Sequence, residues 1–203
     1  MSERALVVSA AGGTGGHVFP ALAVAIALRD RQVDVIWLGT ERGLESRVAA
    51  EHELRLHTID VSGIRGKRWL DKVVAPLMLL AAVFSTLRLF RQTRPACVVA
   101  FGGYVSAAGG CAAFLSRTPL LLQEQNAVVG TTNRLLAPVA KKIFTGFPQV
   151  FIERKSQLFS GNPLRSQFYS LPTPAARDVG RRNELNVLVM GGSQGASVLN
   201  SVL

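Results

Sequence analysis

The sequence predicts an α/β fold in which a parallel sheet is covered by helices. Short runs of β-branched residues alternate with longer segments of helical pattern, which is typical of successive β-loop-α units. Three of the strand-like runs end in a glycine-containing loop that opens a helix. Hydrophobic residues make up 48% of the chain and charged residues only 18%, which favours a large buried core over disorder. A length of 203 residues fits one good-sized domain, or one domain and the start of another.

The first part of the chain is expected to hold five or six β-loop-α units. The expected strands are residues 5–10, 33–38, 56–61, 98–101, 120–123 and 142–145. The expected helices are residues 18–31, 43–51, 69–94, 105–116 and 131–139. Pro20 lies in the first turn of its helix, where a missing N–H group costs no hydrogen bond. Pro76 is expected to interrupt the long fourth segment, because proline removes an intrahelical hydrogen bond.

A domain boundary is expected at Gly161-Asn162-Pro163, which divides the chain into residues 1–162 and 163–203. The second part begins with a connector that contains proline and arginine. It continues with a strand at residues 186–190 and a glycine loop at residues 191–195 (GGSQG). The sequence given ends within the helix that this loop opens. The second part is therefore expected to be the incomplete start of another β-loop-α domain.

The formal net charge is +10 and the sequence pI is about 10.8, which indicates a polyanionic partner. Nucleic acid, an anionic membrane surface and a phosphorylated substrate all agree with this charge. Nucleic-acid binding would call for aromatic stacking platforms or a known reading motif, and the sequence shows neither. We therefore expect no nucleic-acid partner.

The chain is expected to be cytoplasmic. Its N-terminus has no signal-peptide cleavage pattern. Residues 73–87 are uncharged, and this run is shorter than the roughly 18–20 residues that cross a bilayer. Cys97 and Cys111 lie too far apart for a local metal knuckle, so we expect buried free thiols in a reducing compartment.

The three glycine loops are candidate phosphate sites. They lie at residues 12–16 (GGTGG), 102–103 (GG) and 191–195 (GGSQG), each between a strand and a helix. Free N–H groups and the helix dipole favour phosphate oxygens at such a junction, and glycine lets the backbone approach closely. Three such sites suit a reaction between two diphosphate-bearing substrates. The alternative, that the glycines only form tight strand–helix turns, remains open.

Two familiar nucleotide motifs do not fit the first loop. A dinucleotide-binding fingerprint that starts at Gly13 needs glycine at position 18, where the chain has Val18. The second strand is followed by no acidic residue before Glu41 that could bind a ribose. A phosphate-binding P-loop needs lysine and then serine or threonine after its last glycine, but His17 and Val18 follow Gly16. A dinucleotide dehydrogenase and a P-loop NTPase are both disfavoured.

His17 is the leading candidate for a catalytic base. It lies where a helix starts, at the carboxyl ends of the strands, where open α/β sheets bind ligands. A helix N-terminus disfavours the protonated ring, which helps a neutral imidazole act as a base. A structural helix cap is the alternative role. His52 and His57 are expected at surface positions.

The segment Glu124-Gln125-Asn126 ends a strand on the same edge of the sheet. A carboxylate and an amide at that place can bind sugar hydroxyls or an acetamido group. Capping of a helix or turn is an equally open reading.

Six short motifs occur in the order in which one family of bacterial enzymes has them. They are residues 12–20 (GGTGGHVFP), 61–67 (VSGIRGK), 102–106 (GGYVS), 124–126 (EQN), 161–165 (GNPLR) and 191–196 (GGSQGA). Together they resemble the MurG family of N-acetylglucosaminyl transferases, which converts lipid I into lipid II in peptidoglycan synthesis. The resemblance extends over essentially the whole chain.

The resemblance implies a GT-B fold of two Rossmann-like domains with a cleft between them. It also implies an inverting transfer without a metal ion or other cofactor. The donor would be UDP-N-acetylglucosamine, and the acceptor an undecaprenyl-diphosphate muramoyl-pentapeptide. Residues 1–162 would then be the acceptor-binding, membrane-associating domain. Residues 163–203 would be the linker and first β-loop-α unit of the donor domain.

The family's residue roles apply to the positions that match its motifs. His17 would take the proton from the muramoyl 4-hydroxyl. The expected donor-binding residues are Thr14, Gly15, Gly16, Asn126, Arg165, Ser193 and Gln194. The expected residues for the acceptor and its diphosphate are Gly12, Gly13, Gly102, Gly103, Tyr104 and Glu124.

The chain departs from the family in two respects. Gln123 precedes Glu124 where the family commonly has histidine, which puts the role of this side chain in doubt. The family also continues for well over a hundred residues beyond this sequence, so the uridine and sugar pocket is expected to be absent. An alternative function is a non-catalytic half-protein that docks on a membrane and needs a separate donor-domain partner.

The segment from Trp69 to Arg94 combines an apolar body with basic ends. This composition is typical of an interfacial helix on an anionic leaflet, although a sheet-packing helix with solvated basic ends is the alternative. A lipid-linked acceptor favours the membrane reading. The expected membrane-contacting residues are Trp69, Leu77, Leu80, Phe84, Arg88 and Arg91. The protein is accordingly expected to lie peripherally on the inner face of the cell membrane.

Overall fold

A computed structural model describes residues 4–60, 69–151, 156–173, 176, 187–189 and 201, with side chains at all of these except residues 69–73. Contacts within the chain divide it into two units, Met1–Arg165 and Ser166–Leu203. The division lies close to the boundary that the sequence suggests at Gly161-Asn162-Pro163. The assignment of the second unit to a donor domain stays a prediction.

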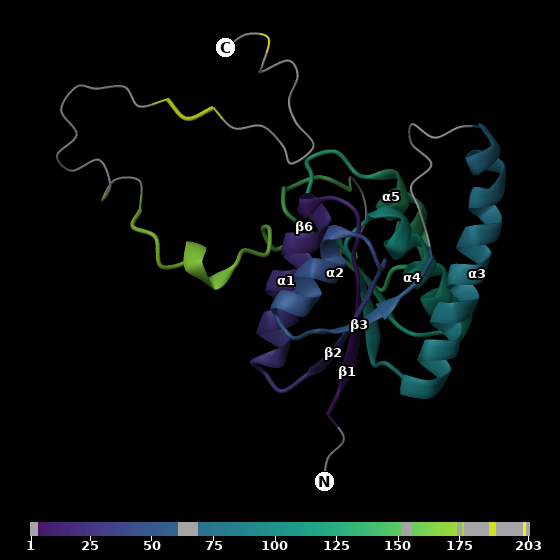
Figure 1. Cartoon of the computed structure of the whole chain (residues 1–203). Coiled ribbons are helices and arrows are strands. Elements are labelled where there is room, and N and C mark those ends of the chain that lie inside the picture. Colours follow the sequence, from purple (N-terminus) through teal and green to yellow (C-terminus); the bar gives the residue numbers. More distant parts are fainter. Residues whose placement is uncertain are drawn as a thin grey trace. The chain divides into compact units, whose positions relative to one another are not determined.

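The first unit is built on one parallel sheet of seven strands in the order β3-β2-β1-β4-β5-β6-β7 (Figure 1). The strands are β1 (Leu6–Ala10), β2 (Asp34–Gly39), β3 (Arg55–Thr58), β4 (Cys97–Ala100), β5 (Leu120–Glu124), β6 (Lys142–Thr145) and β7 (Gln157–Phe159). The helices are α1 (Gly15–Arg29), α2 (Leu44–Glu51), α3 (Trp69–Thr93), α4 (Gly103–Ser116), α5 (Thr131–Leu136) and the short η1 (Ala137–Val139). The predicted α/β class with a parallel sheet is confirmed.

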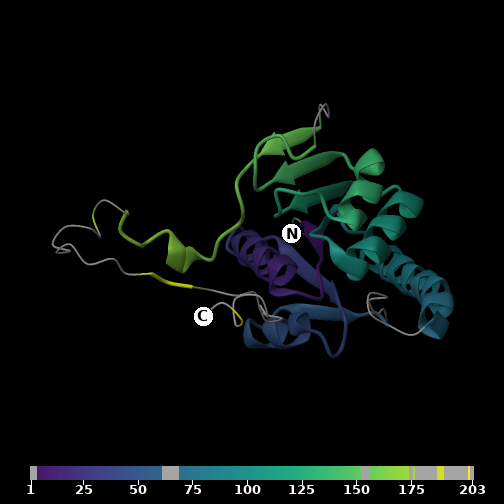
Figure 2. The ribbon, with the colours of Figure 1, turned by 90° about the horizontal axis from the view of Figure 1, so that it is seen from above.

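The strand order reverses between β1 and β4, and this reversal places helices on both faces of the sheet. The chain winds from β1 outward to β3, crosses back through α3, and then winds in the opposite direction from β4. Right-handed crossovers therefore put α1 and α2 on one face and α3, α4 and α5 on the other, as Figures 1 and 2 show. Ala10 pairs with Ala100 in the sheet, so β1 and β4 end level with each other. A ligand crevice is expected at such a reversal, outside the carboxyl ends of the strands.

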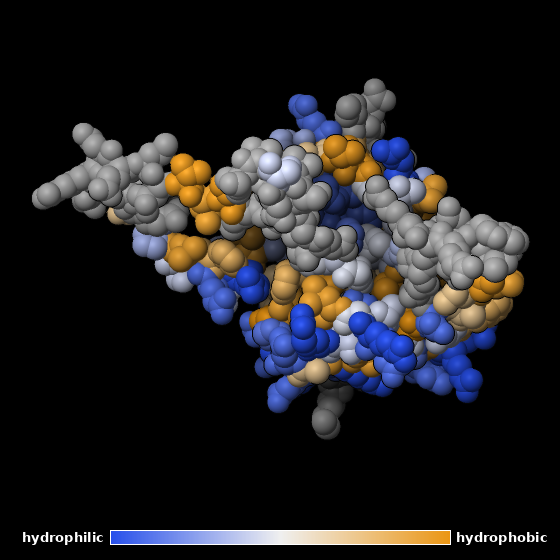
Figure 3. Space-filling model, turned by 45° about the horizontal axis from the view of Figure 1, so that its top comes forward, coloured by the Kyte–Doolittle hydropathy of each residue, from blue (hydrophilic) through white to orange (hydrophobic). Residues whose placement is uncertain are grey.

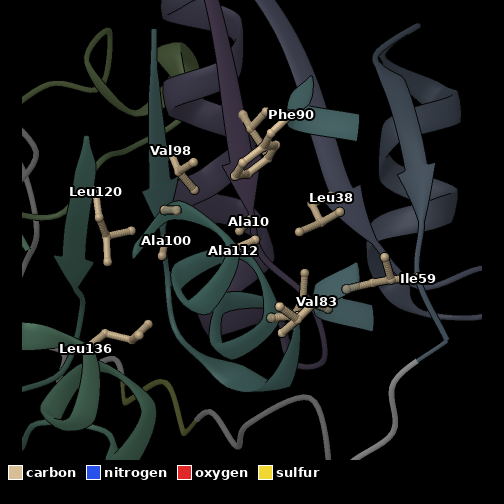
Figure 4. Packing of buried hydrophobic residues seen from close by; sticks show 14 of the residues in the cluster. Ala10, Leu38, Ile59, Val83, Phe90, Val98, Ala100, Ala112, Leu120 and Leu136 are labelled. Carbon is tan, nitrogen blue, oxygen red and sulfur yellow. The ribbon is translucent and has the colours of Figure 1, made fainter. Parts of the chain in front are cut away.

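Each face of the sheet has its own apolar core, because successive side chains of a strand point to opposite faces. Val8 and Ala10 of β1 face α3 and α4, where they pack with Val83 and Phe90 of α3 and Ala112 of α4 (Figure 4). Val7 of β1 faces α1 and packs in the second core with Trp37, Val18 and Leu22. The indole N–H of Trp37 donates a 2.9 Å hydrogen bond to the carbonyl of Ala11, so the polar atom of this buried ring has a partner.

Three elements differ from the sequence-based expectation. Helix α1 starts at Gly15 rather than at residue 18, so His17 lies inside its first turn. Helix α3 runs without interruption through Pro76, which is exposed, so water can satisfy the carbonyl group that loses its partner. Strand β7 was not expected: it has three residues, two of them exposed, at the edge of the sheet.

The strand expected at residues 186–190 does not form at the residues that are described. Val187, Leu188 and Val189 have no regular structure and are 72%, 80% and 44% exposed. A strand needs a neighbour for its N–H and C=O groups, and no described segment pairs with these residues. The third glycine loop, at residues 191–195, lies outside the described residues. In the second unit, the short helix η2 spans Ser166–Phe168.

The two cysteines, Cys97 and Cys111, are free and half-buried rather than fully buried. Burial raises the pKa of both thiols, so both are protonated near neutral pH.

Candidate functional site

Most of the predicted catalytic and substrate-binding residues lie at the carboxyl ends of β1, β4 and β5. The loop after β1 leads into α1, the loop after β4 leads into α4, and the segment after β5 leads into α5. Because β1, β4 and β5 are neighbours in the sheet, these three loops share one edge. We name this set, residues 11–17, 101–106 and 123–133, the carboxyl-edge site.

A buried carboxylate, that of Glu45 at the start of α2, fixes the conformation of the first loop. Glu45 is fully buried. One of its oxygens accepts hydrogen bonds from the backbone N–H and the hydroxyl of Thr40, at 2.9 and 2.6 Å, and the other accepts the N–H of Gly13 at 3.2 Å. A Cβ atom at Gly12 would lie 2.8 Å from this carboxylate, and Gly13 has a φ of +94°. The first two glycines of the loop are therefore needed to fit the backbone over Glu45.

The second loop is held by the hydroxyl of Ser106. This oxygen accepts hydrogen bonds from the N–H groups of Phe101 and Gly102, at 3.1 and 2.9 Å, and donates one to the carbonyl of Ala10 at 2.7 Å. Gly102 has a φ of +103°. Ser106 thus joins the end of β1 to the end of β4, and it fixes the glycine pair beside the first loop.

These contacts change the reading of the glycine loops as phosphate sites. The N–H groups of Gly13 and Gly102 already donate to Glu45 and Ser106, so they are not free for a diphosphate. For Gly13 and Gly102, the geometry fits the alternative interpretation, in which the glycines form tight turns. The first-turn N–H groups of α1 at Gly15 and Gly16, and of α4 at Gly103, have no acceptor within their helices. Binding of phosphate by those three groups stays a prediction.

His17 lies across the glycine pair of the second loop. A Cβ atom at Gly102 would come within 2.7 Å of the ring carbon Cε1 of His17, and one at Gly103 within 3.7 Å of its Cδ2. A Cβ at Gly103 would also lie 3.1 Å from the carbonyl oxygen of Gly12. The glycine pair therefore makes room for the imidazole and brings the two loops together. His17 is partly exposed, and its Nδ1 lies 3.3 Å from Oε1 of Gln125.

The buried side chain of Gln125 connects His17 to the end of the sheet. Its Nε2 donates hydrogen bonds to the carbonyl oxygens of Phe101, at 3.0 Å, and Gln123, at 3.3 Å. The sequence motif pointed to this segment, but a contact of Gln125 with His17 could not be read from it. The two residues are 108 positions apart and meet only because β1 and β5 flank β4.

Glu124 holds the third loop together through both of its carboxylate oxygens. It is 1% exposed. One oxygen accepts the backbone and side-chain N–H groups of Asn126, at 3.0 and 2.9 Å; the other accepts the N–H of Gly130 at 3.0 Å and the side-chain amide of Asn133 at 2.9 Å. Of the two readings that the sequence left open, these contacts support capping. Asn126 is exposed, and no described residue hydrogen-bonds its side-chain oxygen.

Asn162 fixes the segment at the expected domain boundary to the same edge. Its amide nitrogen donates to the carbonyl of Gln125 at 3.1 Å, and its side-chain oxygen accepts from Nε2 of Gln123 at 3.3 Å. Gln123 therefore holds the boundary segment. The guanidinium carbon of Arg165 lies 5.1 Å from the ring centroid of Phe19 on α1, which is a cation–π distance.

The remaining site predictions divide into two groups. Thr14 is the N-cap residue of α1 and makes no side-chain capping bond, and Tyr104 is 40% exposed in the first turn of α4. Ser193 and Gln194 lie outside the described residues. Within the described part of the chain, no three His, Cys, Asp or Glu side chains are grouped so that they could hold a metal ion.

The other two histidines lie outside the carboxyl-edge site. His52 follows the last residue of α2 and is partly exposed. His57 on β3 is also partly buried, and its Nε2 lies 3.4 Å from the hydroxyl of Ser85 on α3. Burial and the neighbouring Arg55 lower the pKa of His57.

A surface hollow of about 980 Å³ lies at the opposite edge of the sheet. It is lined by the amino-terminal ends of strands and by the end of α3. Its arginines are Arg4, Arg29, Arg55, Arg91 and Arg94. We call this the amino-edge hollow. None of the predicted loops reaches it, and its size and charge alone do not give it a reactive group.

Helix α3 exposes apolar side chains on the side that faces away from the sheet. Leu77, Leu80 and Phe84 are 66%, 54% and 69% exposed, and Arg88 and Arg91 are exposed further along the helix. Apolar residues gather over the first part of α3 at the right of Figure 3, with hydrophilic residues below them. The side chain of Trp69 is outside the described set.

By length and composition, Val74–Thr93 of α3 could cross a membrane, and it is the one such helix in the described part of the chain. The segment is longer than the uncharged run because it includes Arg88 and Arg91. Helices of water-soluble cores pass the same test, and α3 packs Ala82, Val83 and Phe90 into the core on its face of the sheet.

The chain matches known proteins over nearly all of its length. Residues 7–145 match the glycosyltransferase family 28 N-terminal domain. A relative from Coxiella burnetii is 47% identical over 98% of the chain, and one from Acidithiobacillus ferrooxidans is 50% identical over 97%. Both bear the name UDP-N-acetylglucosamine--N-acetylmuramyl-(pentapeptide) pyrophosphoryl-undecaprenol N-acetylglucosamine transferase. The chain covers 54% of each, so it spans about half the length of these curated relatives.

Solved structures give the same fold. A crystal structure of Acinetobacter baumannii MurG matches 80% of the chain and 46% of its own length, with 40% identity and a TM-score of 0.69. A putative UDP-N-acetylglucosamine 2-epimerase from Listeria monocytogenes matches 72% of the chain with 16% identity and a TM-score of 0.56, which shows a shared fold alone.

Proposed function

Because residues 7–145 match its N-terminal domain, the chain belongs to glycosyltransferase family 28, and we propose that it is the acceptor-binding half of an inverting N-acetylglucosaminyl transferase. The proposed reaction moves N-acetylglucosamine from UDP-N-acetylglucosamine to the muramoyl 4-hydroxyl of the undecaprenyl-diphosphate-linked pentapeptide. The names of relatives at 47 and 50% identity support this choice of donor and acceptor. The sugar-nucleotide pocket belongs, in this proposal, to the part of those relatives that the chain does not span.

The position of His17 is the observation that carries the proposal. Its ring lies over Gly102 and Gly103 where the strand order reverses, and no described residue hydrogen-bonds its Nε2. A base in that position takes the proton of the attacking hydroxyl. The oxygen then bonds to the anomeric carbon of the donor, the bond from that carbon to the diphosphate breaks on the far side, and UDP leaves with the electron pair and inversion.

Two sets of groups are proposed to hold the diphosphates. The free first-turn N–H groups of Gly15, Gly16 and Gly103 stabilise negative charge at the ends of α1 and α4. Arg165, over the ring of Phe19, adds a positive charge beside α1. Preorganised donors of this kind stabilise charge that develops in the transition state.

We further propose that α3 places the enzyme peripherally on an anionic, cytoplasmic-side leaflet. One side of the helix is buried in the core of the sheet through Val83 and Phe90, whereas Leu77, Leu80 and Phe84 face outward. If α3 crossed the bilayer, it would have to leave that core. The apolar residues of the core that α3 covers would then be exposed. A helix that lies on the surface keeps the core intact and buries its outer side in lipid. A lipid-linked acceptor would then be presented to a site already at the membrane.

Transfer by a hybrid enzyme tests this function. The 203-residue chain is joined to the C-terminal half of the Acidithiobacillus ferrooxidans relative, and transfer of labelled N-acetylglucosamine to a lipid I analogue is measured. We expect turnover by the hybrid and none by the 203-residue polypeptide alone. Turnover by the polypeptide alone would contradict the assignment of the donor pocket. A folded hybrid without turnover that still binds anionic vesicles would favour the non-catalytic docking role.

A further inference from the structure

The side chain of Gln125 is fixed in one orientation by the backbone around it. It is 8% exposed. Its Nε2 has two carbonyl oxygens within hydrogen-bonding distance, those of Phe101 at 3.0 Å and Gln123 at 3.3 Å. If the amide were rotated by half a turn, its oxygen would face both carbonyl oxygens, and three acceptors would meet without a proton between them. The amide nitrogen therefore points to the carbonyls.

This orientation determines what Gln125 presents to His17. With Nε2 toward the backbone, Oε1 lies 3.3 Å from Nδ1 of His17. An amide oxygen only accepts hydrogen bonds, so Nδ1 must carry the proton for the contact to be favourable. A neutral imidazole has one N–H, so the lone pair is then on Nε2.

We propose that Gln125 is a positioning residue that holds neutral His17 as the Nδ1–H tautomer. This inference rests on the proposed role of His17 as the base. It adds the reason why Nε2, and not Nδ1, is the basic nitrogen. Free histidine in water prefers the opposite tautomer, in which Nε2 carries the proton. In that tautomer Nε2 has no lone pair with which to take the proton of the muramoyl hydroxyl. The hydrogen bond from Nδ1 to Gln125 reverses that preference.

The proton count is consistent with one reaction cycle. The proton of the muramoyl hydroxyl moves to Nε2 as the new carbon–oxygen bond forms and the donor's bond to UDP breaks. The ring is then an imidazolium, and Nδ1–H still donates to Oε1 of Gln125. The ring returns to neutral when Nε2 releases its proton to water. The amide takes part in no covalent step, so its contribution is orientation and choice of tautomer.

A second constraint holds the plane of the ring. Without side chains at Gly102 and Gly103, the imidazole can lie close to the backbone, since a Cβ at Gly102 would lie 2.7 Å from Cε1 and 3.0 Å from Nδ1. The glycine pair and Gln125 together limit rotation of the ring. The contact with Gln125 leaves the lone pair of the neutral ring on Nε2.

Nitrogen NMR of the imidazole tests the inference without any transferase activity. The chain has three histidines, so a sample with ¹⁵N-labelled histidine gives few signals, and those of His17 are identified by their loss in His17→Ala. Two-bond proton–nitrogen correlations at alkaline pH show which ring nitrogen is protonated. We expect His17 as Nδ1–H in the wild-type chain. A wild-type His17 protonated on Nε2 would overturn the proposal.

Two substitutions separate tautomer control from folding. Gln125→Met has similar length but no acceptor, so His17 should shift to the Nε2–H form. Gln92→Met, on the exposed side of α3, is the matched control and should leave His17 as Nδ1–H. The signals of His52 and His57 report on the fold in the same spectrum. An unchanged tautomer in Gln125→Met would refute the proposal.

The hybrid enzyme gives the kinetic counterpart. Gln125→Met should lower kcat roughly 10–100-fold with little change in the donor KM, as expected for loss of a partner that orients a reacting group. If the NMR result holds while His17→Ala retains full turnover, the proposed function fails and the tautomer assignment stands. If His17→Ala loses turnover while Gln125→Met retains it, the positioning role fails and the proposed function stands.

Discussion

The two edges of the sheet differ in how their polar groups are held. At the carboxyl-edge site, Glu45, Glu124 and Ser106 are buried and satisfied by backbone groups, and they fix the loops around His17. The five arginines of the amino-edge hollow are, by contrast, all exposed to solvent. Catalysis depends on groups placed before the substrate arrives, so we expect chemistry at the edge where buried groups fix the loops.

The comparison suggests a division of roles, with chemistry at the carboxyl edge and electrostatic attraction at the other. Helix α3 connects the two edges, since it begins beside the carboxyl edge and its last turn, with Arg91, lines the amino-edge hollow. The predictions below test this division, beginning with the largest expected effect.

The largest effect is expected from His17→Ala in the hybrid enzyme. Loss of a general base should lower kcat about 10²–10⁴-fold, with a smaller effect on the donor KM. His57→Ala is the matched control, because it removes an imidazole from β3 without touching the site. Steady-state kinetics with a lipid I analogue measure both. If His17→Ala stays within about threefold of the parent, a range far below general-base effects, the role of His17 is structural.

Replacement of Arg88, Arg91 and Arg94 by glutamine should weaken binding to anionic vesicles about 100-fold. Each basic residue near such a surface contributes about 1 kcal/mol, so three together give about two powers of ten. Sedimentation with vesicles of anionic and neutral lipid measures the change. Arg31, Arg42 and Arg47, all exposed on the other side of the sheet, give a control triple of equal charge. Equal loss in both triples, or binding to neutral vesicles at high salt, would contradict a specific basic end of α3.

Glu124→Gln should lower the free energy of unfolding by about 1–3 kcal/mol, because two of the four donors around the carboxylate would then face an amide N–H. Urea unfolding followed by circular dichroism measures it. Glu41→Gln, at an exposed position, should leave stability unchanged. A Glu124→Gln protein as stable as the parent would mean that the carboxylate does not hold the loop.

The smallest effect concerns pH and His57. Its pKa is lowered by burial and by Arg55, so the folded state disfavours the charged ring. Its contribution to stability is therefore fully present above the unfolded pKa of about 6.5 and is lost as pH falls through the lower folded value. His57→Gln should flatten the pH dependence of unfolding in that window. An unchanged slope would mean that His57 is equally solvated in both states.

Much of the fold could be predicted because it depends on local pattern. The alternation of short β-branched runs with helical segments gave the order of units from β1 to β6. Strand β7 could not be predicted, because Gln157–Phe159 is only three residues long and lies at the edge of the sheet, where one of its sides has no neighbouring strand. The interruption predicted at Pro76 was wrong. At an exposed position of a long helix, the loss of one intrahelical hydrogen bond costs too little free energy to break α3.

The site was only half predictable, because its partners are distant in sequence. His17 and the glycine pair were each found, but their contact depends on β1 and β4 being neighbours. Glu45 lies in the first turn of a helix whose sequence is mostly polar, so the sequence alone does not mark it as buried, yet it is fully buried. Gly39 and Gly43 on either side of it were a signal that could have been used, since a Cβ at either would clash with the Glu45 side chain.

Amide NMR mapping of a diphosphate ligand tests the central claim most directly. The 203-residue chain is titrated with a soluble muramoyl-pentapeptide diphosphate that carries a short prenyl chain. We expect saturable shifts at Gly15, Gly16 and Gly103 and at the ring nitrogens of His17, with Leu6 and Arg29 at the amino edge unchanged. Shifts confined to the arginines of the amino-edge hollow, with the carboxyl-edge amides unmoved, would contradict the account.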